Sequence, residues 1–179
     1  MTETSEKVVQ IPLLDQAAAA IKDKGSFQKE LTGQELAEIM GSVVKSLTAG
    51  QEAVRATVTT MQVQIERQQG TVAGNIQVEK PITATIGVRC TLGNDTAPNR
   101  LRLVGLDVEE KASFAAKLPL KAVNIKRKAQ HALRDPNQAL FTAFGSQLEP
   151  KGVRLTGIGL HFGDTTLAVA LNGQPIVRK

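Results

Sequence analysis

Two histidines and one cysteine are the only His and Cys side chains in the chain, so their placement decides whether a metal or nucleophilic site is plausible. His131 falls on the polar face of an expected helix, and His161 lies beside Phe162 near an expected turn. Cys90 falls in an alternating strand pattern, and no carboxylate stands at metal-ligand spacing from either histidine. We predict no metal ion, and we interpret Cys90 as a small core residue, since free cysteine is commonly buried.

Acidic side chains at Asp107, Glu109 and Glu110 form a local cluster. Paired carboxylates can perform acid–base catalysis, but a solvated strand end is the simpler interpretation of these three. The sequence also has no G-x-S-x-G elbow, no Walker A loop and no G-x-G-x-x-G that opens a helix. We therefore expect no catalytic residues, no cofactor and no enzymatic activity.

A basic cluster is the most informative charged feature, and no acid lies within it. Its members are Lys121, Lys126, Arg127, Lys128 and Arg134. At about 100° per helical residue, Lys121 and Lys128 align and the others widen the stripe. Such a face can contact anionic lipid or a nucleic-acid backbone, although an ordinary solvated helix face is the simplest interpretation. No aromatic residue is interleaved with the cluster, which argues against sequence-specific recognition of RNA.

The composition of the 179 residues suits one domain with a sizeable core. Apolar residues make up 41%, but aromatic residues only 3%, with five Phe, no Trp and no Tyr. Aliphatic side chains must therefore fill the core, and sites built on aromatic stacking lose most of their parts. The net charge of +5 fits either a plain soluble surface or an acidic partner.

The first residues contain no basic start followed by a continuous apolar run, so we expect no signal peptide. No uncharged apolar stretch approaches the ~18 residues that a spanning helix needs. We therefore expect a cytoplasmic protein, with association at the periphery of a membrane as a further option.

Two helices are expected near the start of the chain. Pro12 suits a first helical turn, and Gly25 suits the stop after a run of Leu, Ala and Ile at helical spacing. Thr32 and Glu35 then fit a capping box. Gly50 ends the apolar stripe of this second helix, whose members are Leu36, Ile39, Met40, Val43, Val44 and Leu47.

From Val54 the apolar period changes to two, which predicts a series of strands. We place a turn at Gln69-Gly70, a break at Pro81 and a loop over residues 93–99. The alternation shifts phase near Gly105, which predicts a bulge there. Residues 101–108 and 153–160 share the pattern apolar-Arg-Leu-x-Gly-apolar-x-apolar, and the second segment predicts the same device.

A third helix is expected over residues 119–134, where the basic cluster lies. A fourth begins with Asp135 as N-cap, Pro136 at the first position and Gln138 to complete a capping box, and it ends at Pro150. Its apolar stripe is formed by Leu140, Phe141, Phe144 and Leu148. A last hairpin follows, and we expect a two-residue turn at Gly163-Asp164 with positive φ at the glycine.

These elements predict an α+β fold, in which a single domain holds a strongly bent antiparallel β-sheet packed against amphipathic helices. Residues 1–27 form an N-terminal segment with a short amphipathic helix. Residues 28–173 form the domain, and residues 174–179 form a basic tail.

The order of the elements resembles the small bacterial branch of the tubular lipid-binding (TULIP-like) superfamily. The stretches LTGQELAEIMGSVVKSL and LEPKGVRLTGIGLHFGDTTLAVAL carry the resemblance, which covers residues 31–171 as order and pattern. It implies a curved sheet wrapped around a long helix, with an apolar groove for lipid tails. Many such proteins are exported or anchored to membranes, a feature that we do not expect here. The residues that would border the groove are Leu36, Met40, Val43, Phe141 and Phe144.

Three functional hypotheses follow. The first is a non-enzymatic binding protein with an apolar groove for a lipid or another hydrophobic ligand, which also associates with an anionic membrane surface. The second is an assembly protein that forms homo-oligomers or a scaffold through the N-terminal helix or a strand edge. The third and weakest is non-specific binding of nucleic acid through the basic helix.

Overall fold

The computed structural model describes residues 12–48, 55–80, 84–113, 127, 130–131 and 134–177. Side chains are described for the same residues except 42–48, 55–56, 78–80, 84 and 110–113. The helices are α1 (Pro12–Lys24), α2 (Gly33–Thr48), α4 (Pro136–Leu148) and the short 3₁₀ helix η1 (Glu149–Lys151). The strands are β1 (Ser26–Leu31), β2 (Arg55–Glu66), β3 (Gln69–Lys80), β4 (Ala84–Asn94), β5 (Leu101–Ser113), β6 (Val153–Phe162) and β7 (Leu167–Pro175).

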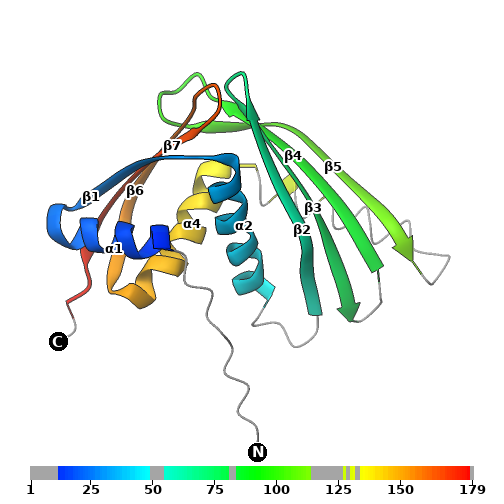
Figure 1. The fold of residues 1–179 in the computed structure, drawn as a ribbon, viewed down its shortest axis with the longest axis horizontal. Coiled ribbons are helices and arrows are strands. Elements are labelled where there is room, and N and C mark those ends of the chain that lie inside the picture. Colours follow the sequence, from blue (N-terminus) through cyan, green and yellow to red (C-terminus); the bar gives the residue numbers. More distant parts are fainter. Residues whose placement is uncertain are drawn as a thin grey trace, which may run out of the picture.

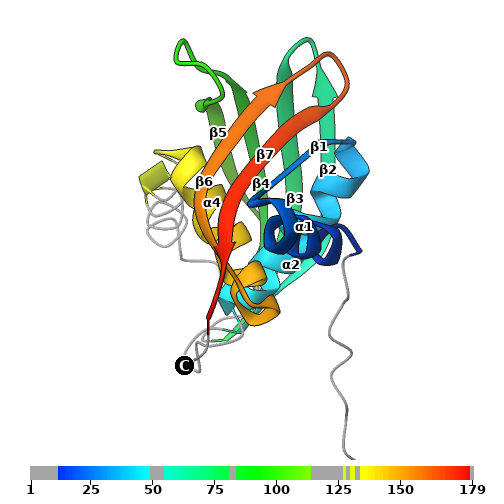
Figure 2. The ribbon, with the colours of Figure 1, turned by 90° about the vertical axis from the view of Figure 1, so that its left-hand side faces the viewer.

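The predicted fold class is confirmed: the chain forms a single α+β domain whose strand pairs are all antiparallel. The expected bent sheet is divided into two hydrogen-bonded sheets, one of three strands in the order β1-β7-β6 and one of four in the order β2-β3-β4-β5. Figure 1 shows the two sheets arching over α4 and α2, and Figure 2 shows them as separate layers. The antiparallel pairing follows from strands that alternate apolar and polar residues.

Two predicted helix ends, the stop of α1 and the start of α2, are present in detail. Gly25 ends α1 with φ 77°, and its N–H donates to the Ile21 carbonyl at 2.8 Å. The capping box of α2 is complete, because the Thr32 N–H donates to Glu35 Oε2 at 2.9 Å and the Glu35 N–H donates to Thr32 Oγ1 at 3.3 Å. These bonds satisfy backbone donors that have no partner within the helix.

Two predicted turns are wrong in position or length. The β2–β3 turn lies at Arg67 and Gln68, with φ 50° and 63°, instead of at Gln69-Gly70. A tight hairpin turn needs positive φ at both central residues, and non-glycine residues adopt it here. The β6–β7 loop has four residues, 163–166, closed by a bond from the Gly163 N–H to the Thr166 carbonyl at 2.8 Å.

The bulge near Gly105 is confirmed, and its counterpart in β6 is confirmed with it. In β5 the register skips Val104, since Thr91 pairs with Gly105 and Leu92 pairs with Leu103. In β6 it skips Thr156, because Leu155 pairs with Gly173 and Gly157 pairs with Asn172. Val104 and Thr156 occupy the same place in the two similar eight-residue segments. Each bulge bends a long strand and so helps a sheet to curve.

The N-terminal helix is part of the main core. Five apolar residues of α1 are at most 8% exposed, and they are Leu13, Leu14, Ala17, Ala18 and Ile21. They belong to one hydrophobic cluster with the inner faces of β6 and β7. The predicted boundary between residues 27 and 28 lies inside β1, and the boundary between 173 and 174 lies inside β7. The predicted helix over residues 119–134 lies mostly outside the described residues.

None of the described helices combines the length and apolar character that a membrane-spanning helix requires.

Candidate functional site

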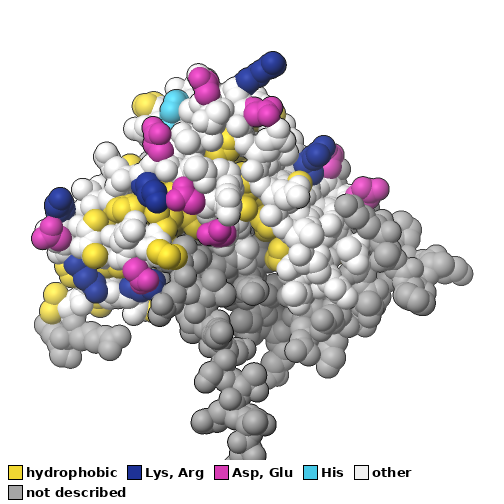
Figure 3. All heavy atoms as spheres, in the orientation of Figure 1, with side chains coloured by type: hydrophobic (Ala, Val, Ile, Leu, Met, Phe, Trp, Pro, Cys, Tyr) yellow, Lys and Arg dark blue, Asp and Glu magenta, His cyan; other side chains and the backbone are white. Residues whose placement is uncertain are grey.

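An apolar cavity of about 340 Å³ lies between the four-stranded sheet and the helices α2 and α4. Its wall is almost wholly hydrocarbon. Figure 3 shows hydrophobic side chains along the border between the helices and this sheet. The strands contribute Val58, Met61, Val63, Gly70, Val72, Gly74, Ile76, Val88, Cys90, Leu92, Leu101, Phe162 and Leu167. The helices contribute Leu36, Met40, Pro136, Ala139, Leu140, Thr142, Ala143 and Ser146.

The inner face of β3 explains part of the hollow. Its inward positions alternate glycine and aliphatic residues at Gly70, Val72, Gly74 and Ile76. The ring of Phe162 fills the space above Gly70, where an added Cβ would lie 2.4 Å from it. At Gly74 an added Cβ would meet the Thr60 carbonyl oxygen at 2.9 Å and Met61 Sδ at 3.5 Å, so this glycine allows the close approach of β2, and the hollow lies beside Val72 and Ile76.

The same inner face is only partly shielded from solvent. Val63, Val72, Ile76 and Val88 are half-buried although they point away from the outer surface. Well-packed interiors leave few voids larger than a water molecule. An apolar wall of this kind, with none of the described side chains packed against it, is typical of a ligand pocket.

Helix α4 presents two different faces to the interior. Phe144 is 2% exposed within the main core, and Leu140 bridges the core and the cavity. Ala139 and Ala143 each precede one of these residues, about 100° away around the helix, and line the cavity. The large side chains thus fill one half of the molecule, and the small ones leave room in the other.

The structure brings together two of the five predicted groove residues. Leu36 and Met40 of α2 line the cavity. Phe144 lies in the filled core and Phe141 is half-buried against it, so neither forms part of the cavity wall. Val43 lies in α2, but its side chain is outside the described residues. The groove role of these residues stays a prediction.

Sequence reasoning missed the strand residues of the cavity wall and the small residues of α4. The alternation of glycine and aliphatic residues in β3 was no clear signal for a hollow, since Gly70 accommodates the Phe162 ring and was interpreted as part of a turn. The contribution of Ala139 and Ala143 has no clear signal either, since alanine is common in any helix.

Cys90 is 6% exposed, as predicted for a core residue, and it also lines the cavity. Burial raises the pKa of the Cys90 thiol to about 11. The thiol therefore stays protonated near neutral pH, and it acts as an apolar wall rather than as a nucleophile.

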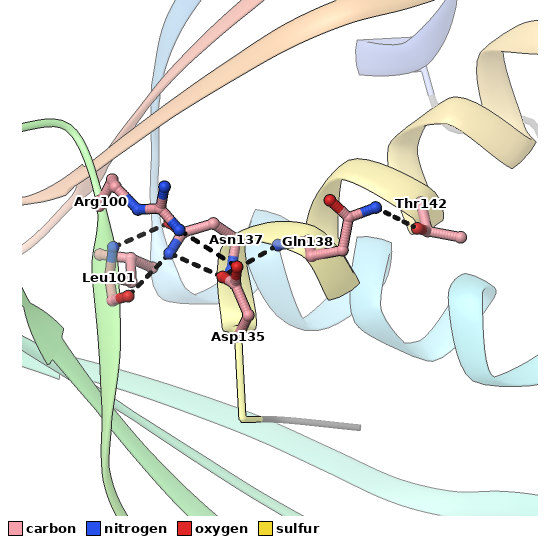
Figure 4. Close-up of polar contacts among 6 residues, drawn as sticks. All are labelled: Arg100, Leu101, Asp135, Asn137, Gln138 and Thr142. Carbon is pink, nitrogen blue, oxygen red and sulfur yellow. Dashed lines mark hydrogen bonds and ion pairs between the residues drawn. The ribbon is translucent and has the colours of Figure 1, made fainter. Parts of the chain in front are cut away.

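A polar hollow adjoins the cavity at the start of α4. Its wall consists of Asp95, Arg100, Leu101, Arg102, Leu103, Gln130, His131, Arg134, Asp135, Pro136, Asn137, Gln138, Ala139 and Thr142. Arg100 and Asp135 form an ion pair across it at 3.1 Å (Figure 4). Asp135 is also the N-cap of α4, because its carboxylate accepts from the N–H groups of Asn137 and Gln138 at 3.0 and 3.3 Å.

The electrostatics of Asp135 reflect these bonds. Partial burial acts to raise the pKa of Asp135, but the N–H donors of Gln138 and Asn137 and the nearby Arg100 hold it below its ordinary value. Gln138 does not return a bond to the N-cap, so the predicted capping box is only half formed. Its side-chain amide instead donates to Thr142 Oγ1 at 3.4 Å (Figure 4).

Two asparagines fix the walls of the site through backbone groups. Asn137, 9% exposed, accepts from the Leu101 N–H at 2.9 Å and donates to the Leu101 carbonyl at 2.8 Å (Figure 4). Asn94 binds Phe162 in the same way, at 2.7 Å from the N–H and 3.0 Å to the carbonyl. Asn137 thus ties α4 to β5, and Asn94 ties the two sheets together.

The predicted basic cluster is described only in part. Arg127 and Arg134 are exposed, and Arg134 lies on the wall of the polar hollow. Lys121, Lys126 and Lys128 lie outside the described residues. Its role as a contact surface therefore stays a prediction.

The titratable residues that could perform catalysis are dispersed. His131 and His161 are both exposed and belong to different elements. Within the described part of the chain, no three His, Cys, Asp or Glu side chains gather in a way that could hold a metal ion.

No protein-family model matches the chain, and no curated protein matches it. Among solved structures, the chain is similar to one described as the crystal structure of lipopolysaccharide binding protein. The two share 9% identity, with a TM-score of 0.31, over 89% of this chain. The chain spans 42% of the length of that protein. Membership of the tubular lipid-binding superfamily stays a prediction.

Proposed function

We propose that this protein is a non-enzymatic binding protein that holds a hydrophobic ligand in the apolar cavity. The observation that carries the proposal is the cavity itself, which has a volume of about 340 Å³ and a nearly pure hydrocarbon wall. Ligand sites are commonly concave, mostly apolar and within about 300–1,000 Å³. Removing an aliphatic ligand from water into this wall is favourable, because the hydrophobic effect scales with the apolar area that is buried.

The volume limits the size of the ligand. A dry cavity of about 150 Å³ lined by Leu, Ile and Phe accepts benzene. On the same scale, a cavity of about 340 Å³ accepts a single aliphatic chain of roughly ten to fourteen carbons. A lipid acyl chain of that length is the ligand class that fits best.

We also propose where in the cell the protein acts. A cytoplasmic protein that exchanges its ligand at an anionic membrane surface is in accord with the exposed Arg127 and Arg134. Flotation with vesicles of anionic and of neutral lipid at low salt measures this association. Equal recovery with the two vesicle types would remove the membrane part of the proposal.

The alternative of assembly through the N-terminal helix has less support. Every large apolar residue of α1 is buried within the same chain, so this helix has no apolar stripe left for a second subunit. In the described part of the molecule, the exposed large hydrophobic residues are Val104 and Val177. A scattered pair of this kind is normal for a surface.

Native mass spectrometry after detergent-free purification tests the proposed function. We expect one additional apolar molecule per chain, and we expect dodecan-1-ol to replace it. Val88→Phe should abolish this binding, because Val88 lines the cavity opposite Gly74 and the ring has room to enter. Val104→Phe is the matched control, since Val104 is 47% exposed on the same sheet. Binding of dodecan-1-ol that survives Val88→Phe in a folded protein would contradict the proposal.

A further inference from the structure

The apolar cavity and the polar hollow share a wall. Leu101, Pro136, Ala139 and Thr142 line both spaces. Leu101 and Pro136 are buried, whereas Thr142 on the next turn of α4 is exposed. A molecule that leaves the cavity past Thr142 therefore enters a hollow lined by charged and hydrogen-bonding side chains, and not open apolar surface.

Some charged side chains of the hollow are already paired with each other, and others are exposed to a ligand. Three arginines and two aspartates line it, which gives 3 − 2 = +1. Arg100 and Asp135 pair with each other at 3.1 Å. Asp95 accepts from the N–H of Thr96 at 2.7 Å. Arg102, whose Nε donates to the Asn94 carbonyl at 3.3 Å, and Arg134 are exposed on the same wall, and together with the Asp95 carboxylate they account for the net charge of +1.

The start of α4 does not itself offer an anion site. Pro136 has no N–H, and the N–H groups of Asn137 and Gln138 already donate to the Asp135 carboxylate. An anion in the hollow must therefore be held by side chains. Guanidinium groups suit carboxylates and phosphates, because they donate several hydrogen bonds in one plane. Thr142 and Gln138, joined at 3.4 Å, add a hydroxyl and an amide at the border with the cavity.

We propose that the ligand is a single-chain amphiphile with an anionic head group, whose chain occupies the apolar cavity and whose head lies in the polar hollow against Arg102 and Arg134. The proposal rests on the proposed function, since it needs the cavity to hold the chain. The head group is a carboxylate or a phosphate, both of which present the oxygens that arginine binds.

Isothermal titration with three probes of equal chain length tests the head-group site: dodecan-1-ol, dodecanoate and dodecyl phosphate. We expect at least one anionic probe to bind about tenfold or more tightly than the alcohol, since a hydrogen bond to a charged group is worth more than a neutral one. The tighter of the two anions identifies the head group. Added NaCl should weaken the anions and leave the alcohol unchanged.

The double variant Arg102→Gln/Arg134→Gln should reduce the preference for the anion to about twofold or less, with dodecan-1-ol affinity unchanged. Arg154→Gln is the matched control, because Arg154 is exposed on β6 and lines neither space. Equal affinity for all three probes, or an anion preference that survives the double variant, would overturn the head-group site while cavity binding stands. No binding of any probe, the alcohol included, would overturn the proposed function itself.

Discussion

The three-stranded and four-stranded sheets have the same alternation of apolar and polar residues, but their inward faces are packed to different degrees. Apart from the half-buried Ile158, the inward residues of β6 and β7 are at most 7% exposed, and they are Val153, Leu155, Leu160, Phe162, Leu167, Val169 and Leu171. In the four-stranded sheet, Cys90, Leu92 and Leu101 are buried, but four other residues that face the cavity are half-buried, namely Val63, Val72, Ile76 and Val88.

The difference comes from what lies opposite each face. The core residues of α1 and the Phe144 side of α4 fill the space before the three-stranded sheet. The small residues Ala139 and Ala143 of α4 face the open space before the four-stranded sheet. An alternating pattern therefore states which face is inward, but the size of the opposing side chains decides whether that face packs or holds a ligand.

The largest effect is expected in the filled half. Leu171→Ala should lower the free energy of unfolding by about 3 kcal/mol, because Leu171 is 1% exposed and its removal leaves a void. Leu92→Ala removes the same groups beside an existing cavity, and we expect a smaller loss of about 2 kcal/mol. Urea unfolding measures both values. A greater loss for Leu92→Ala would contradict the distinction between the two halves.

The next largest effect is expected at the contact between the two sheets. Asn94→Ala leaves the N–H and carbonyl of buried Phe162 without these partners, and we expect a loss of about 2 kcal/mol. The matched control is Asn75→Ala, whose exposed amide donates to Thr60 Oγ1, with an expected change of at most about 0.5 kcal/mol. Similar losses for the two variants would mean that Asn94 does not hold the sheets together.

A valine-to-phenylalanine substitution should destabilise the protein more in the filled half than in the half that holds the cavity. Val169→Phe should destabilise the protein by about 2 kcal/mol, because Val169 is 3% exposed in a filled core. Val88→Phe should change stability by about 1 kcal/mol or less, since the ring enters the cavity. Thermal and urea unfolding of the ligand-free proteins decide the point. Equal destabilisation would indicate that the four-stranded half holds no usable space.

The smallest effect concerns the helix start at the border of the two halves. The Thr32 N–H donor and the Lys29 ammonium lower the pKa of Glu35 below its ordinary value. A lowered folded pKa means that the ionised carboxylate adds stability above the unfolded pKa of about 4.3, and that this is lost as pH falls through the folded pKa. Glu35→Gln should therefore flatten the pH dependence of stability between about pH 5 and 3.

The control for this test is a second carboxylate of α2. Glu38→Gln removes an exposed carboxylate of the same helix for which no capping bond is formed in the described structure. It should leave the pH dependence near that of the original protein. If Glu35→Gln and Glu38→Gln follow the same curve, the capping box contributes nothing measurable.

Local signals in the sequence were enough for most element types and several ends, but strand β1 (Ser26–Leu31) was not predicted. Thr32 with Glu35, Asp135 with Pro136, and the phase shift at Gly105 each act through neighbouring residues, so a single sequence contains them. The β2–β3 turn was misplaced because Gly70 suggested a turn, whereas tertiary packing of Phe162 explains that glycine. The division into two sheets depends on contacts between distant residues such as Asn94 and Phe162, which no local pattern encodes.

The candidate site was predictable only on α2. Leu36 and Met40 follow from the apolar stripe, whereas Phe141 and Phe144 were predicted at the groove through the resemblance to the lipid-binding superfamily. In the structure these two side chains lie in or against the filled core, and Ala139 and Ala143 line the cavity. Which face of a buried helix meets a void is a property of its partners and not of its own sequence.

One half of the molecule is filled, and we propose that the other half takes an apolar chain. Methyl NMR of valine- and leucine-labelled protein titrated with dodecan-1-ol tests it most directly. We predict saturable shifts at Val63, Val72 and Val88, and no comparable shift at Val169 or Leu171. Shifts confined to exposed methyl groups such as Val104 and Val177, or equal shifts in both halves, would contradict the account.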